Sequence, residues 1–308
     1  MALLLAPCAF VSQTMYREAL SDPVFAFREG TTTLVAGDSH LEAALNPSYF
    51  PGSVNCSLSG ESYFFTYYKV KHLLGRNPGI RRVVIGCAPH NFARDYQESF
   101  LFGAKLRFME GYYFLMDEPG KRLIRSWKSS YIQPFLIYDL GIPLHLYRNR
   151  LLLKRCTGTR LLTRDVPFFG GFKDIAPIRC NAASVKEKIK LYFGRGENSK
   201  DGVYGSSYMA EYLAKIAELC QSRSVDLVLI STPVYGGYQR YIPSSARSGF
   251  EKIITGLQVS HPSVRFIDAS DVIVQDNYFF DADHLNRDGA RQFSTYCASI
   301  LSEKSYCR

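Results

Sequence analysis

Hydrophobic positions along the chain form short continuous runs rich in β-branched residues, separated by longer stretches with helical spacing. From residue 31 onward the two patterns alternate, which is typical of a parallel sheet covered by helices on both faces. The runs predict five strands: Thr32–Ala36, Val54–Leu58, Arg82–Cys87, Val225–Ser231 and Val264–Asp268. The predicted helices are Leu41–Leu45, Glu61–Leu74, Ser206–Ser222, part of Pro243–Val259, and Arg287–Leu301. The simplest fold is an α/β, doubly wound, five-stranded parallel sheet with a flavodoxin-like strand order.

The alternation stops near residue 97 and resumes after residue 204. We interpret residues 97–205 as an insertion after the third strand, within one domain that spans residues 31–303. The insertion is rich in aromatic and basic residues, and two interpretations stay open. It is either a substrate cover or a surface facing a membrane or partner, or a subdomain whose aromatic side chains form their own core. The first interpretation makes these residues candidate contacts: Arg122, Arg125, Trp127 and Lys128.

Residues 1–30 form an N-terminal segment that begins with an almost wholly apolar stretch, Met1 to Val11. This stretch is shorter than the roughly 20 residues that span a bilayer, and it lacks the basic start of a signal peptide. We interpret it as the trailing end of a signal or membrane anchor, with a buried first helix or strand as the alternative. The first interpretation places the protein in the cell envelope, periplasmic or otherwise extracytoplasmic; the second is compatible with a cytoplasmic protein.

The composition is globular, with 46% hydrophobic and 21% charged residues, and the eight cysteines include no C-x-x-C pair. The net charge of +9 is unevenly distributed. Residues 101–200 hold 19 Lys and Arg against 8 Asp and Glu, whereas the remainder holds 18 against 20. The basic segment indicates an anionic partner or surface. No nucleic-acid-binding signature accompanies the charge, so nucleic acid is not expected, and neither is a metal or a cofactor.

The first candidate site is the stretch Leu-Val-Ala-Gly-Asp-Ser-His that ends the first strand. Ser39 would lie at a strand-to-helix corner, where free N–H groups of the following helix stabilise negative charge. Ser39 is therefore a candidate nucleophile. The alternative is that Asp38 or Ser39 only caps the helix. His40 either lines the site or extends the start of the helix.

Other predicted strands end in polar groups at the same edge of the sheet, where ligands bind in open α/β folds. Gly60 follows the second strand, and His90 and Asn91 follow the third. We expect these loops to lie close to Ser39, with His90 as a candidate substrate or membrane contact.

The loop after the fifth strand contains Asp281 and His284, three residues apart. Within one turn the carboxylate can hold one ring nitrogen while the other nitrogen faces outward. That arrangement suits a base that takes the proton of a serine. Asp283 is a rival carboxylate, which points away if the turn is helical.

The order Gly-Asp-Ser, Gly, Asn and Asp-x-x-His resembles the SGNH/GDSL hydrolase superfamily over residues 31–96 and 206–303. The resemblance implies Ser39 as nucleophile, His284 as base and Asp281 as the partner of that base.

The same resemblance implies an oxyanion hole formed by the backbone N–H groups of Ser39 and Gly60 and the side chain of Asn91. The third block departs from the family's Gly-x-Asn-Asp, because the asparagine is displaced and no aspartate follows it.

The forms Gly-Asp-Ser-His and Asp-His-Leu-Asn look most like the envelope-associated branch, linked to polysaccharide O-acetylation or teichoic-acid D-alanylation. This implies a serine esterase or O-acyltransferase that acts on acyl, first of all acetyl, esters of a cell-envelope polysaccharide or other acylated glycan. A membrane-bound O-acyltransferase is the implied protein partner. One alternative is a non-catalytic envelope protein that binds an anionic polymer or such a partner through the insertion. Another is a soluble lipase or thioesterase.

Overall fold

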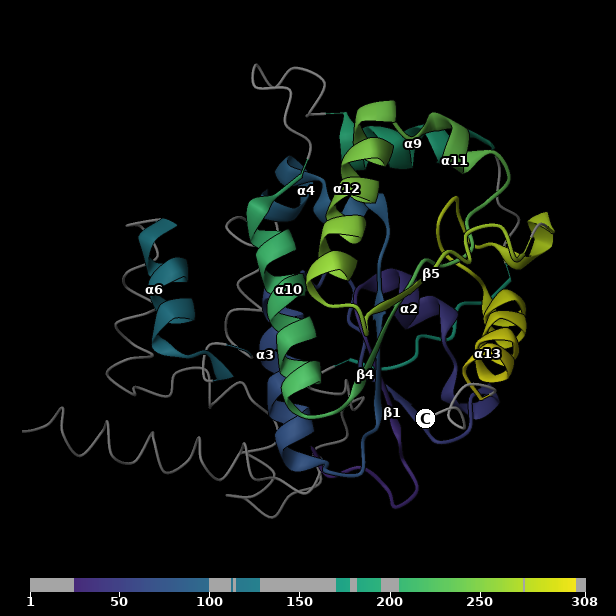
Figure 1. The fold of residues 1–308 in the computed structure, drawn as a ribbon. Coiled ribbons are helices and arrows are strands. Elements are labelled where there is room, and N and C mark those ends of the chain that lie inside the picture. The colour runs from purple at the N-terminus through teal and green to yellow at the C-terminus, as the bar shows by residue number, and fades with distance from the viewer. Residues whose placement is uncertain are drawn as a thin grey trace, which may run out of the picture. The chain divides into compact units, whose positions relative to one another are not determined.

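Five short strands pair into one parallel sheet (Figure 1). The strands are β1 (Thr33–Ala36), β2 (Ser53–Asn55), β3 (Arg82–Gly86), β4 (Asp226–Ile230) and β5 (Arg265–Ile267). Their order is β2-β1-β3-β4-β5, and every neighbouring pair is parallel. The central strands are covered on both faces, and after a polar first residue each of them is apolar. The predicted doubly wound α/β sheet and its strand order are confirmed.

This computed structural model describes residues 25–99, 112, 115–127, 170–177, 182–194, 205–273 and 275–302. The chain divides into one unit of residues 1–27 and 105–166 and a larger unit of residues 28–104 and 167–308. The sheet belongs to the larger unit, and helix α6 (Glu118–Trp127) to the smaller. The predicted anchor remnant, Met1 to Val11, lies outside the described residues. Among the helices that are described, none is both long and apolar enough to cross a membrane.

Helices cover the two faces of the sheet in the pattern that right-handed crossovers require (Figure 1). One face carries α3 (Tyr63–Arg76), α10 (Ser207–Ser222) and α12 (Ser244–Ser260), and α3 packs against α10. The other face carries α2 (Ser39–Ala44), which packs against α13 (Arg287–Ser302). Three further helices are α4 (Arg94–Ser99), α9 (Ala182–Phe193) and α11 (Tyr238–Tyr241).

The hydrophobic core between the sheet and the α2/α13 layer consists of aliphatic and aromatic side chains that are almost fully buried, among them Val35, Leu41, Val228, Phe279 and Phe293. This core fixes the end of β1 and the start of α13 relative to each other. The strand order changes direction between β1 and β3, because β2 lies on one side of β1 and the later strands lie on the other. Doubly wound folds bind their ligands at this point. The loops after these strands carry the candidate site.

A buried ion pair ties α3 to the loop that follows β2. Lys69 Nζ lies 2.6 Å from Glu61 Oε2, and both side chains are fully buried. Lys69 also donates to the carbonyl of Cys56, and Thr66 Oγ1 donates to Glu61 Oε1 at 2.7 Å. The pair therefore holds both ends of the loop that contains Gly60.

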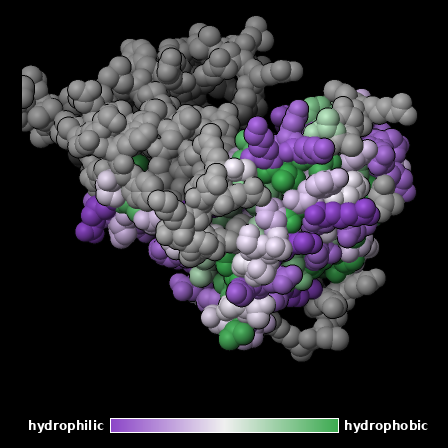
Figure 2. Space-filling model, turned by 90° about the horizontal axis from the view of Figure 1, so that it is seen from above, coloured by the Kyte–Doolittle hydropathy of each residue, from purple (hydrophilic) through white to green (hydrophobic). Residues whose placement is uncertain are grey.

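Exposed large hydrophobic residues in the described part of the chain are scattered: Tyr49, Leu191, Tyr241, Val259 and Val272. Hydrophilic and hydrophobic residues are intermixed among the coloured residues of Figure 2. Isolated apolar residues of this kind are ordinary on protein surfaces and indicate no docking face by themselves.

We expect Lys69→Met to lower the free energy of unfolding by about 3–5 kcal/mol, because Glu61 would be left as an unpaired buried charge. Urea denaturation measures the loss. The control is Glu211→Gln, which breaks the surface pair between Glu211 and Lys215 in α10 and should cost less than about 0.5 kcal/mol. Equal losses in the two variants would contradict the importance of burial.

Candidate active site

Ser39 is the first residue of α2, directly behind β1. Asp38 is the N-cap of this helix, because its Oδ1 accepts a hydrogen bond from the backbone N–H of His40 at 3.0 Å. Of the two capping residues that the sequence allowed, Asp38 therefore takes this position. The hydroxyl of Ser39 is left for a different contact.

That contact is with a histidine that comes from the far end of the chain. Ser39 Oγ lies 2.8 Å from His284 Nε2. The other ring nitrogen, Nδ1, lies 2.9 Å from Asp281 Oδ1 and 3.1 Å from Oδ2. The structure thus brings together the three side chains to which the sequence assigned catalysis, in the order serine, imidazole and carboxylate.

Asp283 does not point away from the ring. The expectation that Asp283 points away assumed a helical turn. The segment that leads to His284 contains bends instead. Asp283 Oδ1 lies 3.1 Å from His284 Nδ1, next to Asp281. Two carboxylates therefore face the same ring nitrogen.

These carboxylates favour a proton on Nδ1 and a charged ring. Burial by itself lowers the pKa of His284, but Asp283 and Asp281 outweigh burial and raise the pKa above its ordinary 6.5. Burial raises the pKa of Asp281, but the hydrogen bond with His284 lowers it by a larger amount, so the net shift is downward. In neutral His284 the proton on Nδ1 leaves a lone pair on Nε2, directed at Ser39.

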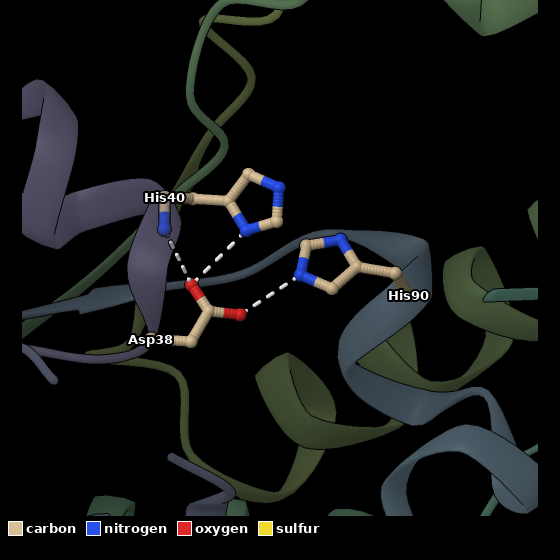
Figure 3. Close-up of side chains that lie close together, drawn as sticks. All are labelled: Asp38, His40 and His90. Carbon is tan, nitrogen blue, oxygen red and sulfur yellow. Dashed lines mark hydrogen bonds and ion pairs between the residues drawn. The ribbon is translucent and has the colours of Figure 1, made fainter. Parts of the chain in front are cut away.

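Asp38, His40 and His90 form a second cluster of side chains (Figure 3). The carboxylate of Asp38 lies between two rings, with Oδ1 3.1 Å from His40 Nδ1 and Oδ2 2.9 Å from His90 Nε2. His40 Nε2 lies 3.1 Å from Asp283 Oδ2. The ring of His40 also stacks on that of His284, with centroids 4.8 Å apart and an interplanar angle of 9°. His40 therefore bridges two carboxylates and supports the base.

The charges in this cluster follow from its contacts. Burial opposes the charge on His40, but Asp38 and Asp283 outweigh it and raise the pKa of His40 to about 10. Burial raises the pKa of Asp38, yet the charge of His40 and the hydrogen bonds of both imidazoles hold this pKa well below its usual range. Burial and the charge of His40 lower the pKa of His90. His40 is thus an imidazolium, and His90 is neutral.

Two groups in the described part of the chain have ligand atoms within 4.8 Å of one another and so have the spacing of metal sites: Asp38, His40 and His90, and His40, Asp283 and His284. Both groups depend on His40. Each ring nitrogen of His40 faces a carboxylate oxygen at 3.1 Å, which is hydrogen-bond geometry. A protonated imidazole has no lone pair for a metal, so we interpret both groups as hydrogen-bond networks.

The backbone N–H groups of Ser39 and Gly60 have no hydrogen-bond partner among the described residues. Gly60 has a φ of +73°, a conformation that glycine adopts without strain. The loop before it lies beside Ser39, because the N–H of Leu58 donates to the carbonyl of Gly37 at 2.9 Å. Two free donors next to the serine are what an oxyanion hole requires.

Asn91 is engaged with protein groups. Its Oδ1 accepts from the N–H of Ala88 at 2.8 Å, and its Nδ2 donates to Asp38 Oδ2 at 2.8 Å. The structure therefore places Asn91 as a support for Asp38. Its part as a third oxyanion donor stays a prediction.

A cavity of about 200 Å³ borders the two buried histidines and the ends of β4 and β5. His40, His90 and Asp283 line it, whereas Ser39 and His284 do not. His40 and His90 are buried, so neither lies on an outer surface that contacts a membrane. Their predicted part in binding substrate stays a prediction.

The candidate contacts in the insertion are described only in part. Arg122 is an exposed residue of α6. The backbones of Arg125 and Trp127 belong to the same helix, but their side chains lie outside the described residues, as does Lys128. Sequence reasoning missed Lys188 of α9, which reaches the carboxylates beside His284. The sequence signal for Lys188 was only a basic residue in a segment that lacks the alternation of strands and helices.

Comparisons with known proteins gave distant similarities. One family model, which carries no descriptive name, matches residues 196–305, less than half of the chain. No curated protein matches the sequence. A lipolytic protein of the G-D-S-L family from Desulfitobacterium hafniense is 10% identical, with 88% of this chain and 99% of that chain covered and a TM-score of 0.39.

Two further solved structures come from Bacteroides species. An acylhydrolase from Bacteroides fragilis is 9% identical, with 93% of this chain and 94% of that chain covered and a TM-score of 0.41. A GDSL-like lipase from Bacteroides thetaiotaomicron is 11% identical, with coverages of 94% and 97% and a TM-score of 0.39. Identities and TM-scores this low do not establish a shared activity.

We expect the stability difference between wild type and His40→Gln to be largest below about pH 6.5 and to shrink toward pH 10. The fold raises the pKa of His40 from 6.5 to about 10. Its protonated form therefore stabilises the fold fully below the unfolded value, and this stabilisation is lost as pH rises through the folded value. Thermal unfolding at several pH values measures the difference. The control is His261→Gln, at the partly exposed C-cap of α12, and equal trends in both variants would contradict the assignment.

Proposed function

We propose that this protein is a serine hydrolase or acyltransferase of the SGNH/GDSL type, acting on acyl esters through an acyl-Ser39 intermediate. The observation that carries the proposal is the continuous contact from Ser39 Oγ to His284 Nε2, at 2.8 Å, and from His284 Nδ1 to Asp281, at 2.9 Å. This is the arrangement of nucleophile, base and orienting acid found in serine acyl-transfer enzymes. The sequence motifs and the open edge of the sheet support the same assignment.

In the first half-reaction, Ser39 Oγ attacks the carbonyl carbon of the ester while His284 Nε2 takes the hydroxyl proton. Asp281 and Asp283 hold Nδ1–H and stabilise the imidazolium. The negative charge on the carbonyl oxygen is stabilised by the N–H groups of Ser39 and Gly60, a single such donor being worth about 10²–10³ in rate. The tetrahedral intermediate then expels the alcohol, which takes the proton from His284.

In the second half-reaction, a hydroxyl group attacks the acyl-Ser39 ester and gives its proton to His284. The intermediate collapses, the acyl product leaves, and Ser39 regains the proton. Water as the attacking group gives hydrolysis, and a sugar hydroxyl gives transfer. Both outcomes use the same side chains, so the choice depends on which hydroxyl reaches the acyl group.

We propose an O-acylated, anionic cell-envelope glycan as the substrate, with a membrane-bound O-acyltransferase as the partner. The support comes from the sequence: the excess of basic residues between positions 101 and 200, the aromatic residues among them, and the apolar N-terminal stretch. Exposed Arg122 is consistent with contact to an anionic polymer.

We expect a fluorophosphonate probe to label the wild-type protein and to leave Ser39→Ala unlabelled, because the probe traps the activated serine. The labelling rate should rise with pH through an apparent pKa above 6.5, since His284 acts only when unprotonated and its pKa is raised. His284→Asn should slow labelling by about 10⁴-fold or more. Mass spectrometry of the intact protein measures labelling.

The matched control is Ser57→Ala, a buried serine near the site, which should be labelled like wild type. If the folded wild-type protein is not labelled, the enzyme assignment is wrong, and the non-catalytic binding protein becomes the better hypothesis. A series of nitrophenyl esters then separates the remaining enzyme classes. An O-acetyl enzyme loses rate beyond short acyl chains, whereas a lipase does not.

We expect the combined substitutions Arg122→Gln, Arg125→Gln and Lys128→Gln to weaken binding to a polyuronate by about 10- to 100-fold at low salt. Isothermal titration across a salt series measures the binding. The control removes three exposed basic residues outside the insertion: Arg223, Lys252 and Arg291, each changed to Gln. Equal weakening in both triple variants would reject the insertion as the binding surface.

A further inference from the structure

One face of α9 holds the loop that carries the base. Ser184, Lys188 and Tyr192 are spaced four residues apart, so they lie in one row along the helix. Ser184 Oγ accepts from the N–H of Ala282 at 3.0 Å. The whole row therefore contacts a single short segment, because the other two residues bind the carboxylates on either side of Ala282.

Lys188 reaches both carboxylates that face the base. Its Nζ lies 3.0 Å from Asp281 Oδ2 and 2.8 Å from Asp283 Oδ1. It also lies 3.3 Å from His284 Nδ1. Because Nδ1 carries its own proton toward the carboxylates, we assign Lys188 as the ion-pair partner of Asp281 and Asp283 rather than as a donor to the ring. One cation thus sits where two carboxylates and the base meet.

Tyr192 binds the second carboxylate oxygen of Asp283. Its hydroxyl donates to Asp283 Oδ2 at 2.6 Å, whereas Lys188 occupies Oδ1. The pKa of Lys188 is raised, because Asp283 and Asp281 outweigh the effect of burial. Lys188 is therefore protonated at neutral pH, and its side chain is 19% exposed.

We propose that Lys188 is a positioning residue for the base: it holds Asp281 and Asp283 against His284, and its charge favours the unprotonated form of the ring. This inference rests on the function proposed above. Without Lys188 the two carboxylates would repel each other, and both would attract a proton to His284. The base would then be protonated, and inactive, over a wider range of pH.

The other charged groups around His284 do not replace Lys188. From its own loop the ring meets the carboxylates of Asp281 and Asp283. From α2 it meets the hydroxyl of Ser39 and the imidazolium of His40. The charge of His40 also lowers the pKa of His284, but His40 pairs with Asp38 and Asp283 rather than with Asp281. His90, from the loop after β3, contacts Asp38 and is neutral. Lys188 is thus the only ammonium or guanidinium group that the described part of the chain places on these carboxylates.

The test is the pH dependence of fluorophosphonate labelling in the full-length protein. We expect Lys188→Met to move the acid limb of the profile upward by about 1–3 pH units, the effect of removing one nearby charge. Below the limb this is a loss of about tenfold or more in rate, with recovery at high pH. Lys188→Arg keeps the charge and should restore most of the wild-type profile.

Lys186→Met and Lys190→Met are the matched controls, because both lysines are exposed on α9. They should leave the profile in place. An unmoved limb in Lys188→Met, or an equal loss of rate at every pH, overturns the inference while the proposed function stands. A wild-type protein that is folded and unlabelled overturns both.

Circular dichroism shows whether each variant is folded. If Lys188→Met does not fold, Tyr192→Phe carries the test, because it removes only the hydroxyl that holds Asp283. We expect a smaller shift of the acid limb in the same direction, since Asp283 loses a donor and its negative potential at His284 grows. No shift in Tyr192→Phe would then overturn the inference.

Discussion

The carboxylate of Asp283 is the group on which the rest of the site depends. A buried anion is tolerated only when donors or cations surround it, and Asp283 is buried with four such groups. They are His40 at 3.1 Å, Lys188 at 2.8 Å, Tyr192 at 2.6 Å and His284 at 3.1 Å. These residues come from α2, α9 and the loop before α13. One charge therefore fixes three parts of the chain that are far apart in sequence, and fixes them around the base.

The balance of charge in this cluster suits the reaction that we propose. Three carboxylates face two cations in the resting site: Asp38, Asp281 and Asp283 against His40 and Lys188. The excess negative charge is compensated when His284 takes the proton of Ser39. The same excess raises the pKa of His284. The cluster must therefore stabilise the imidazolium that forms in the reaction without keeping His284 protonated beforehand. The positive charges of His40 and Lys188 limit the rise in the pKa of His284.

The sheet and the core of the site could be predicted because they depend on local patterns. The aliphatic run of β3 needs two covered faces, and the observed bounds, Arg82–Gly86, differ from the prediction by one residue. The contact between Asp281 and His284 follows from a spacing of three residues, which keeps the two side chains together in several backbone conformations. The direction of Asp283 does not follow from spacing. It depends on whether the backbone is helical, and the bends that bring it to the ring have no clear sequence signal.

Helix α9 could not be predicted for a different reason. Its functional row, Ser184, Lys188 and Tyr192, is a polar stripe that faces inward, whereas amphipathic patterns assign polar stripes to solvent. The groups that make this stripe favourable lie about ninety residues further along the chain, so no local window contains both partners. The connection from β3 to α10 leaves the sheet at its carboxyl edge, where ligand-binding loops end. A segment inserted there meets the carboxylates of those loops directly. Lys188 in this segment is then mostly buried against two carboxylates. Its charge acts on His284, although the two residues are far apart in the sequence.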